Sequence, residues 1–379
     1  MPPLPQARCW VDIDLAALER NLRRTKAGLP QGIRYVAVVK ADAYGHGIHP
    51  VVSRLIQCGA DIFAVANIME GAQIREIGSG WPILVLSPVL PGEEDALLDY
   101  DLIATISTQE EANRFNEFAQ KQNTQLPVHI KIDTGMGRSG VWHSEAHDLL
   151  ATCNKLQHLR IEGLYTHFAD ASGDPGFTQH QRDLFLQSTA DFREQHDGEP
   201  LLIHADSSSS LESIGGNSPV NAVRVGLLQY GVPPNPESIL ANVQVEPVLS
   251  FYTKVGLVKT LPAGTGISYG RTHILEKDTT IAVLAGGYGD GIPLSLSNCG
   301  EVLVDGHRLP ILGRVTMDQT IVDASKLPNL FPGQTATLIG QDQGKEISLP
   351  DFAARANSIP YECLCSITKR VQRFYRVAE

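Results

Sequence analysis

The stretch "AVVKADAYGHG" (residues 37–47) places a lone lysine, Lys40, directly after an apolar run. Such a run predicts a buried strand, with the lysine at its end. Burial lowers the pKa of a lysine, and the neutral amine is the nucleophile of Schiff-base chemistry. The alternative is a lysine whose ammonium reaches solvent at the rim of the fold. The polar residues and glycines that follow, including Tyr44, favour the chemical interpretation.

Other chemically capable side chains also end apolar runs. Each has a structural alternative: an ordinary loop, a satisfied core histidine or a helix cap. Serine hydroxyls beside backbone N–H groups are also suited to binding phosphate. The set comprises Lys131, Asp133 and Arg138 in "KIDTGMGRSG", His167 after "IEGLYT", Ser207 and Ser208 after "LLIHAD", and Arg224 and Gly226 in "AVRVG".

Short apolar runs alternating with helix-like segments must position these residues. Eight such units over about 200 residues predict a parallel (β/α)₈ barrel, whose chemistry lies at the carboxyl ends of the strands. An open doubly wound sheet is the alternative, but no G-x-G-x-x-G follows the first run. The predicted strands are 34–40, 61–66, 82–87, 102–107, 127–134, 161–168, 201–207 and 222–226.

Beyond residue 243 the chain becomes rich in β-type runs divided by Gly and Pro, which predicts a mainly antiparallel β domain. The Pro-rich "VPPNPES" (232–238) is the predicted junction. We therefore expect a barrel over 9–242 and a β domain over 243–379. Whether the opening strand, or residues 1–8, pair with the β domain stays open.

Composition excludes several classes of protein. The formal net charge of −11 disfavours nucleic acid and anionic membranes as partners. The amino terminus lacks the apolar core of a signal peptide, and no apolar run approaches the length of a membrane span. The six cysteines fit no zinc pattern and indicate reduced thiols in a cytoplasmic protein, so we expect no metal.

Eight segments, in order, resemble those of the alanine racemase family. They are "AVVKADAYGHG", "KIDTGMGRSG", "GLYTHF", "RVGLLQYG", "GISYGRTH", "GYGDGIP", "GRVTMDQ" and "IPYECLCSITKRV", and they run along nearly the whole chain. The resemblance implies a homodimeric isomerase with a barrel and a β domain. It would use pyridoxal 5′-phosphate (PLP) to interconvert L- and D-alanine and supply D-alanine for peptidoglycan.

The resemblance also implies roles for individual residues. Lys40 would carry PLP as a Schiff base and act as one base, and Tyr269 of the partner subunit would be the other. Arg224 would face the pyridine nitrogen and His167 would lie beside the ring. Lys131 would be carbamylated and orient Arg138. The remaining positions are Tyr44, Ser207, Ser208, Gly226, Leu227 and Tyr361 near the cofactor phosphate, and Arg138, Met317 and Asp318 near the substrate, the last two from the partner.

Two positions depart from the family pattern, and other functions stay open. Ser207 replaces the usual Asn, and Asp206 replaces a small apolar residue, which puts the fine geometry near the phosphate in doubt. The alternatives are a broader alanine/serine racemase, a PLP-dependent decarboxylase of basic amino acids, for which Cys363 and Cys365 leave some room, a non-enzymatic PLP carrier and a Schiff-base aldolase. His46 has no assigned role.

Overall fold

The computed structural model describes residues 7–208, 210, 218–234 and 238–377, so 235–237 of the predicted junction lie outside it. The described chain forms two compact units. The barrel unit comprises residues 18–43 and 48–245, and the β unit comprises residues 7–17, 44–47 and 246–377. Residues 44–47, which begin four positions after Lys40, belong to the β unit.

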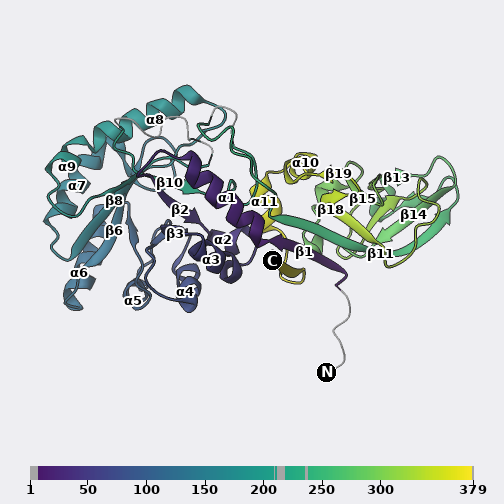
Figure 1. Cartoon of the computed structure of the whole chain (residues 1–379), viewed down its shortest axis with the longest axis horizontal. Helices are drawn as coiled ribbons and strands as arrows, with labels where there is room; N and C mark the ends of the chain where they lie inside the picture. The colour runs from purple at the N-terminus through teal and green to yellow at the C-terminus, as the bar shows by residue number, and fades with distance from the viewer. Residues whose placement is uncertain (1–6, 209, 211–217, 235–237, 378–379) are drawn as a thin grey trace. The chain divides into compact units, whose positions relative to one another are not determined.

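The barrel unit closes eight parallel strands into a ring, which confirms the predicted fold (Figure 1). Hydrogen-bonded pairing follows the orders β10-β2-β3-β4 and β5-β6-β8-β9. Parallel bridges, Leu84 to Ile103 and Ser207 to Arg224, join the two sets. The strands are β2 (Arg34–Val38), β3 (Ile62–Val65), β4 (Ile83–Val85), β5 (Ala104–Ile106), β6 (Leu126–Asp133), β8 (Leu159–Tyr165), β9 (Leu202–His204) and β10 (Ala222–Val225).

Amphipathic helices cover the outside of the ring. The strands are therefore buried on both faces, which is why their sequences are continuous apolar runs. Helix α1 precedes the first barrel strand, and its Asn21 donates to the Gln229 carbonyl beyond β10. The helices are α1 (Leu15–Gly28), α3 (Ile48–Gln57), α4 (Ile68–Ile77), α5 (Glu94–Asp99), α6 (Gln109–Lys121), α7 (Ala146–Lys155), α8 (Pro175–Ser188) and α9 (Ala190–Gln195).

The β unit is built on a mainly antiparallel sheet with the order β16-β15-β18-β11-β1-β20. Its long central strand β11 also pairs with β14, which pairs with β17. The strands are β1 (Cys9–Asp14), β11 (Leu249–Leu261), β14 (Thr279–Leu284), β15 (Glu301–Val304), β16 (His307–Pro310), β17 (Thr320–Asp323), β18 (Thr335–Asp342), β19 (Lys345–Ile347) and β20 (Gln372–Arg376). Two short helices, α10 (Leu349–Arg355) and α11 (Pro360–Cys365), follow β19.

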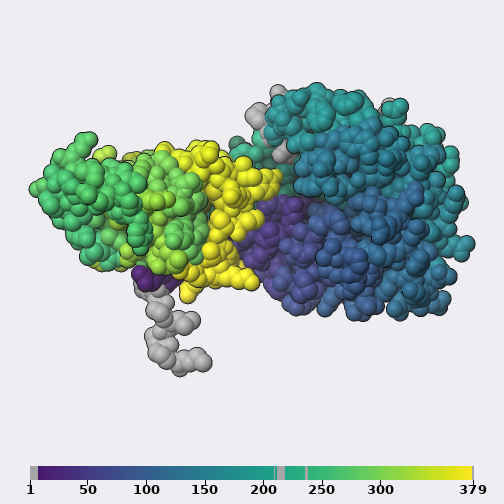
Figure 2. Space-filling view, turned by 180° about the vertical axis from the view of Figure 1, so that it is seen from behind, coloured from purple at the N-terminus to yellow at the C-terminus, as the bar shows by residue number. Residues whose placement is uncertain are grey.

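The structure shows the pairing of the opening strand, which the sequence left open. β1 pairs antiparallel with β11 and parallel with β20, so residues 9–14 belong to the β unit and not to the barrel. In the space-filling view these purple residues lie against the green and yellow residues of that unit (Figure 2). The physical reason is visible in the strand, whose side chains alternate between buried and partly exposed, as in a half-covered antiparallel sheet.

Candidate active site

Lys40 begins a single helical turn, α2 (Lys40–Tyr44), just beyond β2. The turn is left-handed, with φ angles of 54°, 55° and 52° at Ala41, Asp42 and Ala43. This conformation destabilises L-residues by roughly 1–2 kcal/mol each, so the turn needs support from elsewhere. Backbone strain of this kind is concentrated at functional sites.

Two carboxylates supply that support. Glu70 of α4 accepts the Ala41 N–H at 2.7 Å and the Ala66 N–H at 2.8 Å, one through each oxygen. Asp42 accepts the Ile48 N–H at 2.7 Å and so caps α3. Sequence reasoning did not single out Glu70, because Ala41 becomes its neighbour only through the packing of α4 beside the turn.

Arg224 is buried at the end of β10, with 4% of its surface exposed. Burial lowers its pKa to about 10. This value is still well above neutral pH, so the guanidinium is charged there. Its two Nη groups make five hydrogen bonds, and all five go to backbone carbonyls or histidine rings. These bonds go to the His204 carbonyl at 3.0 Å, His204 Nδ1 at 2.8 Å, the Thr166 and Ala205 carbonyls at 2.8 Å each, and His167 Nδ1 at 3.2 Å.

These contacts fix the protons of three histidines, because a guanidinium only donates hydrogen bonds. His167 and His204 accept through Nδ1, which leaves their ring hydrogens on Nε2. The His204 Nε2–H then donates to His129 Nδ1 at 3.0 Å. Burial first, and positive charge second, lower the pKa of His129 and His167 to about 3 and that of His204 well below its ordinary value. All three rings are therefore neutral.

Lys131 on β6 is 4% exposed, and its Nζ donates to Ser139 Oγ at 2.7 Å. Burial, followed by repulsion from Arg138 and Arg224, lowers its pKa to about 8. Its pKa also responds to Lys40, so these predicted site residues share one electrostatic environment. A lysine with this pKa has a much larger neutral fraction near neutral pH than an ordinary lysine.

Asp133, the last residue of β6, organises the loop that carries Arg138. Its Oδ1 accepts N–H bonds from Gly135, Met136 and Gly137 at 2.9, 2.8 and 3.2 Å, and its Oδ2 accepts the Arg138 N–H at 3.0 Å. Burial opposes ionisation, but these four bonds outweigh it and lower the pKa of Asp133. The loop is therefore a preformed turn around an ionised carboxylate.

Ser207 and Ser208 follow β9 and lie beside the end of β10. Ser208 Oγ accepts the Gly226 N–H at 2.9 Å, which leaves its hydroxyl hydrogen available to donate. The Ser207 N–H donates to Ser210 Oγ at 2.8 Å. Leu227 is buried next to Gly226 in the chain. The structure thus brings Ser208 and Gly226 together.

The unusual Asp206 carboxylate is held by α8. Asp206 is fully buried and forms a two-point ion pair with Arg182. Burial raises the pKa of Asp206, and the adjacent Arg182 guanidinium opposes that rise. The sequence signal for this pair was the departure at position 206, although nothing in the sequence indicated the partner.

The β unit holds Tyr44 and Tyr361, whose rings lie 5.6 Å apart. The segment 44–47 is anchored there, because the Gly45 carbonyl accepts from Arg373 Nε at 2.8 Å and the His46 carbonyl accepts from the Tyr375 hydroxyl at 3.0 Å. Gly45 has a φ of 76°, and a Cβ there would lie 2.4 Å from the Leu364 carbonyl oxygen. Its glycine is required by the close approach as well as by the turn.

Tyr269 is 72% exposed on a strained turn of the β unit. The preceding Ser268 has a φ of 60°, and its hydroxyl donates to the Arg314 carbonyl at 2.6 Å. Arg271, two residues beyond, also has a positive φ of 49°. The turn therefore holds the exposed phenol in a defined place.

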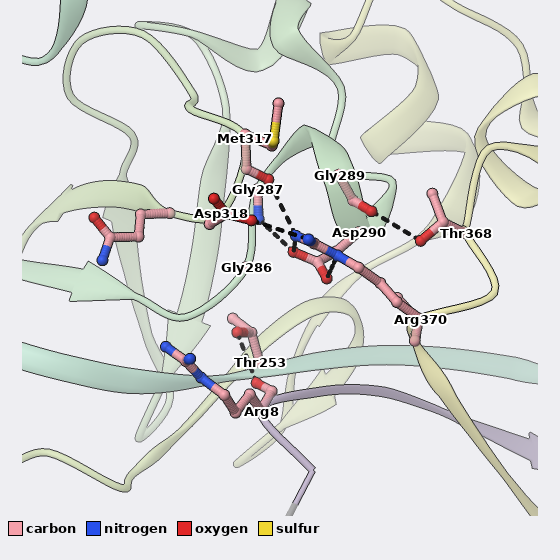
Figure 3. A network of polar contacts seen from close by, with 12 residues as sticks. Arg8, Thr253, Gly286, Gly287, Gly289, Asp290, Met317, Asp318, Thr368 and Arg370 are labelled. Carbon is pink, nitrogen blue, oxygen red and sulfur yellow. Dashed lines mark hydrogen bonds and ion pairs between the residues drawn. The ribbon is translucent and has the colours of Figure 1, made fainter.

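Met317 and Asp318 occupy a loop that is tied to Arg370 (Figure 3). Arg370 binds both oxygens of the buried Asp290, at 2.7 and 2.8 Å, and donates to Asp318 Oδ1 at 2.9 Å and the Met317 carbonyl at 3.2 Å. A Cβ at Gly287 would lie 2.2 Å from the Thr316 carbonyl oxygen, so "GYGDG" must be glycine-rich to let this loop approach. Sequence reasoning missed Arg370 and Asp290.

The described residues contain no group of three or more His, Cys, Asp or Glu side chains suited to a metal ion. All six cysteines are free, and burial raises the pKa of the Cys363 thiol. Within the part of the chain that the structure describes, no helix has the length and apolar character to cross a bilayer.

An eight-stranded parallel barrel with a lysine beyond its first strand and a buried arginine on its last, followed by a β-rich unit, defines a class of barrel enzyme with chemistry at the strand ends. Family models for the N- and C-terminal domains of alanine racemase match residues 13–234 and 248–375. The chain belongs to the alanine racemase family, whose members are PLP-dependent isomerases.

Individual relatives agree over almost the full length. Alanine racemases of Halothermothrix orenii and Nostoc sp. are 40% and 38% identical over 97% of this chain and cover 96% and 95% of those proteins. A structure of the Bacillus anthracis alanine racemase with bound L-Ala-P has a TM-score of 0.88 and 34% identity, over 98% of this chain and 96% of that one. The Bartonella henselae enzyme with covalently bound pyridoxal phosphate has a TM-score of 0.87 and 27% identity, over 98% of this chain and 100% of that one.

Proposed function

We propose that this protein interconverts L- and D-alanine with PLP as its cofactor. The observation that carries the proposal is the pairing of Lys40, on a strained turn at the strand end, with a buried, fully oriented Arg224 in a family of alanine racemases. A lysine amine is the group that attaches PLP, and the arginine is a permanent cation for its ring.

The residues present fit the cofactor. Lys40 would attach it, and the Arg224 Nε–H, unused by the five Nη bonds, is a donor for the ring nitrogen. The Ser208 hydroxyl and the backbone at Gly226 and Leu227 would bind the phosphate, with Ser207 nearby. We assign His167 to the ring, and Tyr44 and Tyr361 to the phosphate, on the family resemblance.

When bound, PLP withdraws electrons from the substrate's α-carbon and makes its proton acidic. Racemisation then needs one proton removed from one face and another returned to the opposite face. We propose Lys40 as the base for one face and Tyr269 of a partner subunit as the base for the other. Because Arg224 donates hydrogen bonds but keeps its protons, it would leave the ring nitrogen unprotonated and restrain side reactions such as transamination.

Arg138 is the proposed partner of the substrate carboxylate, since its guanidinium fork matches that group. Lys131 at present repels Arg138, as its lowered pKa of about 8 reflects. Reaction of the neutral amine with carbon dioxide would give a carbamate, turning this repulsion into attraction and orienting Arg138. We therefore propose that Lys131 is carbamylated.

We also propose a homodimer in which Tyr269, Met317 and Asp318 complete the partner's site. Tyr269 and Met317 are 72% and 53% exposed, and the Asp318 side chain is 65% exposed, although all three lie on hydrogen-bonded turns. Large apolar surface held this rigidly favours a protein partner. A cytoplasmic location and a supply of D-alanine for peptidoglycan complete the proposal.

One panel tests the function. Purified protein should show a long-wavelength absorbance band that borohydride abolishes, and it should interconvert the alanine enantiomers faster than those of serine, lysine or arginine. Lys40→Ala should lack both properties, whereas the exposed Lys155→Ala should keep them. Interconversion of serine at the same rate would indicate the broader racemase. Decarboxylation of lysine or arginine, or PLP binding with no reaction, would contradict the proposal.

A further inference from the structure

Arg182 of α8 and Asp206 beyond β9 form a buried ion pair. Arg182 Nη2 lies 2.8 Å from Asp206 Oδ1, and Nη1 lies 3.1 Å from Oδ2. The side chains are 5% and 0% exposed, and the guanidinium stands 5.1 Å from the centre of the Phe168 ring. This is the parallel two-bond geometry that makes arginine–carboxylate pairs directional.

The pair is also bonded to the loop that carries Ser207, Ser208 and Ser210. Arg182 Nη2 also donates to the Ser210 carbonyl at 3.3 Å, and Ser210 is itself fully buried. Ser210 Oγ accepts the Ser207 N–H at 2.8 Å, and the Ser210 N–H returns to the Ser207 carbonyl at 3.1 Å. The described ends of this loop are therefore fixed to α8 through one guanidinium.

The same loop is bonded to β10 and to the residue that follows it. The Asp206 carbonyl accepts the Arg224 N–H at 3.0 Å, and Ser208 Oγ accepts the Gly226 N–H at 2.9 Å. Asp206 thus uses its main chain toward the residue assigned to the cofactor ring and its side chain toward α8. In the chain, Ser208 lies between Asp206 and Ser210, the two residues that Arg182 binds.

A buried ion pair is a poor source of stability, because desolvation cancels much of the attraction and an apolar replacement is often as stable. Directional order is the better explanation, since one planar group holds both a carboxylate and a carbonyl. The family resemblance has a small apolar residue at position 206, so the pair distinguishes this chain. Its opposite charges also cancel, which leaves no net negative charge beside the serine.

We propose that the Arg182–Asp206 pair is a positioning device that holds the loop after β9 so that Ser208 presents its hydroxyl to the cofactor phosphate. In this proposal both residues act through the loop, and neither is assigned a contact with the cofactor. The inference rests on the proposed function, because it names the phosphate of PLP as the group that the loop binds.

The test uses the full chain and compares Arg182→Met, Asp206→Ala and the double variant Arg182→Met/Asp206→Ala. The readouts are the PLP dissociation constant of the cofactor-free protein, the ³¹P chemical shift of bound PLP and the thermal midpoint without cofactor. Arg114→Met, which breaks another ion pair of the same unit with Glu94, is the matched control.

Each single variant should raise the PLP dissociation constant about tenfold and move the ³¹P signal, because the loop that carries Ser208 loses its attachment to α8. The double variant should regain thermal stability because no lone charge stays buried, yet still bind PLP several-fold more weakly. Arg114→Met should leave affinity and ³¹P shift unchanged. Wild-type affinity and shift in the double variant would overturn the proposal, since the pair would then only fill space. Failure of the wild-type protein to bind PLP would instead count against the proposed function.

Discussion

The two units place their candidate residues in opposite environments. In the barrel unit, Arg224 and Lys131 are almost fully buried and bonded within the fold, so the same contacts support structure and chemistry. In the β unit, Tyr269 and Met317 are exposed on supported turns. The difference shows that the barrel residues are held by bonds within one chain, whereas the β-unit residues lie at the surface of this chain. Substitutions should therefore affect stability and activity together in the first set and separately in the second.

Among these variants, Tyr269→Phe should show the largest loss of activity with almost no loss of stability. Loss of a general base should reduce racemisation by about 10²- to 10⁴-fold. The unfolding free energy should stay within about 0.5 kcal/mol, because an exposed hydroxyl is removed. Exchange of the α-proton with deuterated solvent should fall much further for one alanine enantiomer than for the other. Tyr100→Phe, in the barrel unit, is the control; equal exchange losses for both enantiomers would refute the two-base assignment.

Arg224→Leu should reduce both the free energy of unfolding and the activity. It removes the Arg224 donor from the Thr166 and Ala205 carbonyls and leaves the His204 carbonyl with the Thr166 N–H alone, so we expect the free energy of unfolding to fall by about 3–5 kcal/mol. Chemical denaturation measures this loss, and Arg193→Leu on α9 is the control.

Should Arg224→Leu fail to fold, Arg224→Lys retains the charge but not the fork. It should show a smaller loss of stability together with weaker PLP binding. A stable Arg224→Leu protein would contradict the view that one network serves both purposes.

Arg370→Leu should produce an intermediate effect in the β unit. It leaves the buried Asp290 carboxylate with the Gly287 N–H but without its cation, and should reduce stability by about 2 kcal/mol. The released Met317 loop should raise the KM for alanine more than it lowers kcat. Arg308→Leu, which breaks the exposed pair with Glu301, should cost less than about 1 kcal/mol. Equal losses from both variants would show that the Arg370 cluster has no special role.

The smallest predicted effect concerns pH. The folded pKa of Lys131, about 8, lies below its ordinary value of 10.5, because of burial and then Arg138 and Arg224. Between these values the unfolded chain binds more protons, so stability should rise with pH across this window. In bicarbonate-free buffer Lys131→Met should remove about 1 kcal/mol of that rise for each pH unit, whereas Lys155→Met should not. Added bicarbonate should then stabilise only proteins that retain Lys131. Parallel stability curves for wild type and Lys131→Met would contradict the lowered pKa.

The sequence by itself determined the eight-strand barrel, the β-rich second unit and the positions of Lys40 and Arg224 at strand ends. It could do so because apolar periodicity and turn residues act locally along the chain. Tertiary structure alone decided that β1 belongs to the β unit, that Glu70 supports the left-handed turn, and that Asp206 pairs with Arg182. Arg370 and its glycine-lined loop belong to the same group. Each of these joins groups far apart in sequence, and a hydrogen bond or ion pair is specified only when packing sets the distance and direction between its atoms.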